Sequence, residues 1–66
     1  MWTVIYIAPN KAIAEKYKQI LSDEGMLVQL RTIGSIHLGE NASVEILVPE
    51  SEAEDAHDII TEVIGS

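Results

Sequence analysis

The alternation of apolar and polar positions predicts three strands in this chain. Residues 2–8 are almost continuously apolar and rich in β-branched and aromatic side chains, a composition typical of strands. Residues 26–33 and 43–48 instead alternate between apolar and polar side chains, which indicates strands with one buried face. The inward positions of these two strands are Met26, Val28, Leu30, Val44, Ile46 and Val48.

Apolar residues at helical spacing predict two helices. The first covers about residues 11–24, with Asn10 as its N-cap and Gly25 as the left-handed residue after its end. The second begins near residue 51, where Ser51 and Glu54 have the spacing of a capping box. The buried stripes are expected to be Ile13, Tyr17, Ile20 and Leu21 in the first helix, and Ala53, Ala56, Ile60, Val63 and Ile64 in the second.

This order of elements predicts an α+β fold, a βαββα two-layer sandwich that forms a single domain over residues 1–66. A right-handed crossover places the first and second strands parallel, with the third strand antiparallel between them. The sheet order is then 1-3-2, and both helices cover one face. The result is a ferredoxin-like plan that lacks the last strand, and it leaves the first strand as an open sheet edge.

The sheet face that the helices leave bare is expected to be apolar, because the first strand is apolar on both sides. With Ile5 and Ile7 assigned to the helices, four residues are assigned to the bare face: Trp2, Val4, Tyr6 and Leu47. Small proteins rarely expose a contiguous apolar patch of this kind. The sequence therefore predicts a homodimer that forms through this face or through the open edge.

Composition and charge narrow the range of partners. The chain has no cysteine, so neither a disulfide nor a thiolate metal site can form, and a reducing compartment is expected. It has no apolar run of about 20 residues and no signal-peptide pattern, so we expect a cytoplasmic protein without a membrane partner. The net charge is −7, and residues 50–66 contain six acidic residues but no Lys or Arg. This acidity disfavours binding to nucleic acid.

Motifs for catalysis and cofactor binding are weak. Residues 34–39 have the glycine spacing of a phosphate loop, but Glu40 and Asn41 stand where Lys and Ser or Thr are needed. Glu54 and His57 have a spacing used by helical metal ligands, yet the pair occurs only once. No serine has a histidine at a suggestive spacing. We therefore expect no catalytic residue, no metal or cofactor site and no enzymatic activity.

Four segments together resemble a bacterial domain-of-unknown-function family, described as prokaryotic signal-transducing proteins. The matching segments are Tyr6–Asn10, Ala14–Glu15, Leu21–Gly25 and Glu45–Glu50, and the resemblance extends from Trp2 to about Val63. The family is likened to the nitrogen-regulatory PII proteins, which share the ferredoxin-like plan. In PII proteins the loop between the second and third strands is the recognition element. The resemblance therefore implies signal transduction and directs attention to the same loop here, residues 34–42.

This loop and its base are a candidate contact surface for a partner. The candidate residues are Arg31, Gly34, Ser35, His37, Gly39, Glu40 and Asn41. The leading interpretation is a small non-enzymatic regulatory or interaction module that acts as a homodimer. The alternative is a small-molecule sensor that binds a metabolite or nucleotide at the dimer seam.

Overall fold

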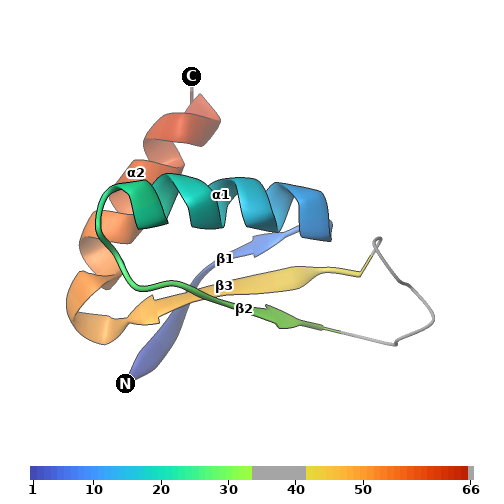
Figure 1. Cartoon of the computed structure of the whole chain (residues 1–66), viewed down its shortest axis with the longest axis horizontal. Coiled ribbons are helices and arrows are strands. Elements are labelled where there is room, and N and C mark those ends of the chain that lie inside the picture. The colour runs from blue at the N-terminus through green and yellow to red at the C-terminus, as the bar shows by residue number, and fades with distance from the viewer. Residues whose placement is uncertain (34–41, 66) are drawn as a thin grey trace.

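Three strands and two α-helices form the protein in a computed structural model, which describes residues 1–33 and 42–65 (Figure 1). In chain order the elements are β1 (Trp2–Ala8), α1 (Lys11–Asp23), β2 (Gln29–Thr32), β3 (Val44–Pro49), the 3₁₀ turn η2 (Glu50–Glu52) and α2 (Ala53–Gly65). The sheet order is β1-β3-β2, and β3 is antiparallel to both of its neighbours. Both helices lie on the same side of the sheet. The predicted α+β fold with strand order 1-3-2 is confirmed.

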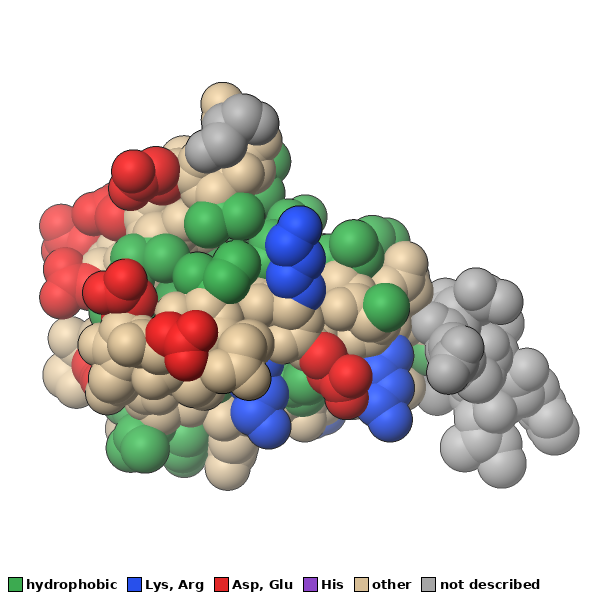
Figure 2. All heavy atoms as spheres, turned by 45° about the horizontal axis from the view of Figure 1, so that its top comes forward, with side chains coloured by type: hydrophobic (Ala, Val, Ile, Leu, Met, Phe, Trp, Pro, Cys, Tyr) green, Lys and Arg blue, Asp and Glu red, His purple; other side chains and the backbone are tan. Residues whose placement is uncertain are grey.

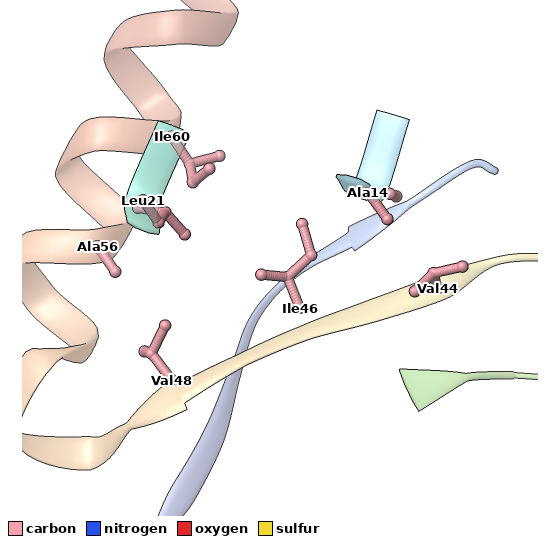
Figure 3. Close-up of a cluster of buried hydrophobic side chains, with 8 residues drawn as sticks. Ala14, Leu21, Val44, Ile46, Val48, Ala56 and Ile60 are labelled. Atoms are coloured by element: carbon pink, nitrogen blue, oxygen red, sulfur yellow. The ribbon is translucent and has the colours of Figure 1, made fainter. Parts of the chain in front are cut away.

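The hydrophobic core lies between β3 and the two helices. Val44, Ile46 and Val48 point from the central strand toward the helices and are almost completely buried (Figure 3). The helix side chains that meet them are Ala14 and Leu21 of α1 and Ala56 and Ile60 of α2. The small alanine side chains allow close approach of helix to sheet, while the larger residues fill the space between the layers. The helices thus bury one sheet face and leave the other bare.

Both ends of α1 are capped as its sequence predicts. The Asn10 side-chain oxygen accepts a 2.9 Å hydrogen bond from the backbone N–H of Ile13. At the other end, Gly25 has a φ of +84°, a conformation that glycine adopts without strain. The N–H groups of Gly25 and Met26 donate to the carbonyls of Ser22 and Leu21, respectively, which is the Schellman pattern. These bonds fix where the chain leaves α1 and turns back toward the sheet.

Replacing Asn10 with alanine is expected to lower the free energy of unfolding by about 1 kcal/mol. Alanine cannot accept the hydrogen bond from Ile13, so the first turn of α1 loses its side-chain cap. Urea unfolding followed by circular dichroism measures the change. Asn10→Asp keeps an acceptor at the same position and should retain most of the stability. Equal losses in the two variants would contradict the capping role.

Two element boundaries differ from the prediction. β2 covers only Gln29–Thr32, so the strand expected over residues 26–33 is shorter at both ends. The second helix begins with the 3₁₀ turn η2, which has no side-chain cap hydrogen bond. Ser51 lies inside this turn rather than before it, so the predicted capping box is wrong. The buried stripe of α2 also stops before Ile64, which is 50% exposed.

Candidate functional site at the open edge of the sheet

A β-bulge in β1 decides which of its side chains face the bare side of the sheet. Val4 pairs with Leu47 of β3, but the next pair joins Tyr6 to Ile46, so Ile5 is an extra residue in the strand. One extra residue reverses the alternation of side chains beyond it. Tyr6 therefore faces the helices, and Ile7 faces the bare side.

The assignment of Tyr6 to the bare face is consequently wrong. Its ring meets the ring of Tyr17 in α1 edge to face, with centroids 5.3 Å apart and an interplanar angle of 71°. Such pairs are more favourable than the buried area alone would give. Ile7, which the sequence pattern had placed against the helices, is instead 54% exposed. The uniformly apolar sequence of β1 contains no alternation that could have revealed the bulge.

The backbone of β1 also has an open side. The N–H of Ile33 donates to the carbonyl of Ser43, so these two residues are a hydrogen-bonded pair of the antiparallel ladder between β2 and β3. This pair shows which residues of β3 direct their backbone groups toward β2. Successive residues of a strand point their backbone N–H and C=O groups alternately to one neighbouring strand and to the other. The core-facing residues of β3 therefore point these groups toward β1. Their partners in β1 direct theirs back at β3. Three residues of β1 therefore point their backbone groups away from the sheet: Trp2, Val4 and Ile7.

The same three residues expose apolar side chains on the bare face. Trp2, Val4 and Ile7 are 40%, 38% and 54% exposed, and we call them the β1 seam. Leu47 lies on the same face as predicted, but in the central strand between its register partners Val4 and Gln29. It is only 7% exposed and offers little surface to a partner. The seam thus combines free backbone groups with exposed apolar side chains along one edge.

An ion pair bounds the seam on the bare face. The Nε of Arg31 in β2 donates to Oε1 of Glu45 in β3, at 2.5 Å. Glu45 is also the register partner of Ile7 across the other side of β3. The hydrogen bond to Glu45, and then its negative charge, raise the pKa of Arg31 above its usual value. The cationic Arg31 and the carboxylate of Glu45 thus form a polar boundary beside Ile7 at this end of the face.

Most of the candidate contact loop lies outside the described residues. Arg31 is described, and it is exposed at the end of β2 that leads to the loop. The other candidates lie outside the described part of the chain: Gly34, Ser35, His37, Gly39, Glu40 and Asn41. The site described here therefore consists of the β1 seam and the adjoining ion pair.

The acidic residues of α2 are spread over its exposed side. Glu54, His57 and Asp58 are all exposed. Within residues 1–33 and 42–65, no group of three or more His, Cys, Asp or Glu side chains is placed to hold a metal ion. Neither helix in that part of the chain has the length and apolar character needed to cross a bilayer.

Comparison of the chain with protein-family models, curated proteins and solved structures gives no match. The functional interpretation therefore depends on the geometry of the β1 seam and on the distribution of charge around it.

Proposed function

We propose that this protein is a non-catalytic regulatory or interaction module that acts as a homodimer joined along the β1 seam. The observation that carries the proposal is the coincidence of free backbone groups and exposed apolar side chains at Trp2, Val4 and Ile7. A second copy of β1 offers the same two features. In two copies related by a two-fold axis, the backbone groups of one β1 can pair with those of the other, and the exposed apolar side chains can cover each other. The same surface of both subunits then forms the interface, as in isologous dimers.

The distribution of charge supports a second copy as the occupant. β1 contains no charged residue, so nothing in the strand itself repels another β1. Exposed edge strands that stay unpaired are commonly protected by Lys or Pro, and β1 has neither within its bounds. Most of the net charge of −7 lies in residues 50–65, which form η2 and α2 in the helix layer. The pairing strands of two negatively charged copies thus bring no like charges of their own to the seam.

The small size of the core also supports a second copy of the chain as the partner at the β1 seam. A chain of 66 residues builds only a small core, and the main cluster of buried side chains takes no residue from the bare sheet face. Proteins below about 70–80 residues are commonly stabilised by disulfides, metals or oligomerisation. This chain has no cysteine, so no disulfide can serve that purpose. Burial of the seam by a second copy would add apolar contact for side chains that the monomer leaves 38–54% exposed.

The signalling part of this proposal is based on the resemblance of two segments to the prokaryotic signal-transducing family, Tyr6–Asn10 and Glu45–Glu50. Both segments lie in or directly after strands of the sheet, and they include the ends of β1 and β3. In this proposal the dimer presents two copies of the module to a cytoplasmic partner. The surfaces of the helices would remain available for contact with that partner.

Replacing Ile7 with lysine is expected to convert the dimer into a monomer. A charge at an edge position opposes strand pairing, and two-fold symmetry introduces it twice in one interface. The dissociation constant should rise at least about 30-fold, as for the loss of a binding hot spot. The new ammonium lies beside Glu45, its register partner, so the monomer itself should remain folded. Sedimentation velocity at tens of micromolar protein measures the change.

Ile64→Lys is the matched control, because Ile64 has a similar exposure but lies at the end of α2. This variant should stay dimeric, and circular dichroism should show both variants folded. A wild-type protein that sediments as a monomer would overturn the proposal. An Ile7→Lys variant that dimerises like the wild type would place the interface elsewhere.

A further inference from the structure

A groove lies between the C-terminal halves of the two helices. Its volume is about 430 Å³, within the usual range of small-molecule pockets. Ile20 of α1 and Ile59 and Val63 of α2 supply its apolar lining, and all three are only partly buried. Two exposed glutamates, Glu24 and Glu62, complete the lining. The groove lies in the helix layer, so it is separate from the β1 seam.

The surroundings of the groove are strongly acidic. α2 and the preceding turn contain six acidic residues and no Lys or Arg. Figure 2 shows Asp and Glu side chains gathered on the side of the molecule where α2 lies, with hydrophobic side chains next to them. Asp23 and Glu24 add two more carboxylates at the end of α1. A molecule bound in this groove therefore contacts apolar side chains and lies close to many carboxylates.

The sign of the charge changes along α1 beside the groove, from basic in the middle of the helix to acidic at its end. Lys16 precedes Ile20 by one helical turn on the same side of α1, and Glu24, the C-cap residue directly after α1, lines the groove together with Ile20. The basic residue lies toward the middle of the helix and the acidic one at its end. A partner with positive charge at one end and apolar side chains beside it matches this order better than a uniformly charged one.

We propose that the groove binds a basic amphipathic segment of a partner protein. Apolar side chains of that segment would pack against Ile20, Ile59 and Val63, while its Lys or Arg side chains would lie near Glu24 and the carboxylates of α2. Complementary charge would guide the encounter and the apolar contact would hold it, as in other helix-in-groove complexes. This inference does not depend on the homodimer, since the groove and the β1 seam share no residue.

The test uses a labelled helical peptide with Leu at i, i+3, i+4 and i+7 and Lys side chains gathered toward one end, and a peptide with Glu in place of each Lys is the comparison. Fluorescence anisotropy should detect saturable binding of the basic peptide only. Glu24→Lys should weaken this binding by about tenfold. Glu15→Lys is the matched control, because it makes the same charge change at an exposed site of α1 outside the groove. It should weaken binding far less.

Several outcomes would overturn the proposal. Equal effects of Glu24→Lys and Glu15→Lys would show attraction by net charge alone. Peptide-induced NMR shifts that fall on β1 rather than on Ile20, Ile59 and Val63 would place the binding elsewhere. Release of monomers on peptide addition would show that a second copy occupies the groove. The Ile7→Lys variant should bind the peptide like the wild type, so a failed dimer proposal leaves this one testable.

Discussion

Replacing Ile46 with alanine is expected to lower the free energy of unfolding by about 2–5 kcal/mol. Ile46 has no exposed surface and lies in the middle of the central strand, where it faces the helix layer. The substitution removes apolar contact and leaves a cavity that rigid neighbours cannot fill. A domain of this size has a total stability of only about 3–10 kcal/mol. The variant should therefore lose a large part of its stability and unfold at a much lower urea concentration than the wild type.

Urea unfolding followed by circular dichroism measures this loss. Ile64→Ala provides the control, because the same side chain is removed at a position that is 50% exposed. Its loss should stay below about 1 kcal/mol. All variants are compared at one protein concentration, since dimerisation makes the apparent stability depend on concentration. Similar losses at the two positions would contradict the assignment of Ile46 to the centre of the core.

Replacing Ala14 with leucine is expected to destabilise the protein by about 1–3 kcal/mol through overpacking. Ala14 is completely buried where α1 approaches the sheet, and it belongs to the same cluster as Val44 and Ile46. The larger side chain needs space that only a shift of α1 can supply. Movement of α1 would also disturb the contact between Tyr17 and Tyr6.

Ala12→Leu isolates the packing effect. Ala12 lies on the exposed side of the same helix, two residues earlier, and leucine and alanine have similar helix propensities. This control should change the stability by less than about 0.5 kcal/mol. Thermal unfolding of both variants should show a lower midpoint for Ala14→Leu alone. A neutral Ala14→Leu would mean that the layers can take up a larger side chain at this buried position without a loss of stability.

The fold could be predicted because its local signals agree with one another. Asn10, Gly25 and the stripe that includes Leu21 all indicate the same helix, and the structure contains it with both caps. The alternation of β3 placed Val44, Ile46 and Val48 in the core, where they are found. The boundaries of β2 and the start of α2 depend on hydrogen bonds that no residue pattern specifies, and there the prediction was wrong.

The candidate site was harder to predict. The sequence pattern placed Trp2 and Val4 on the bare face, and both are there. It also placed Tyr6 there and Ile7 against the helices, because an apolar strand gives no sign of where its alternation reverses. Leu47 was expected to be exposed, but a central strand has neighbours on both sides, and these leave it little open surface. In each of these cases the pairing register of the strands, and not the type of residue, determines which face a side chain lies on and how exposed it is.

The central strand of the sheet is the last of the three along the chain. β1 and β2 do not pair with each other, so neither has a strand partner until Val44–Pro49 has been synthesised. A nascent chain that ends before β3 therefore cannot begin the sheet, and β1 emerges from the ribosome as an unpaired apolar segment. Pairing of β1 with β3 closes a long loop, a step that slows folding. The sheet is consequently expected to form in one step, in which β3 joins the two outer strands.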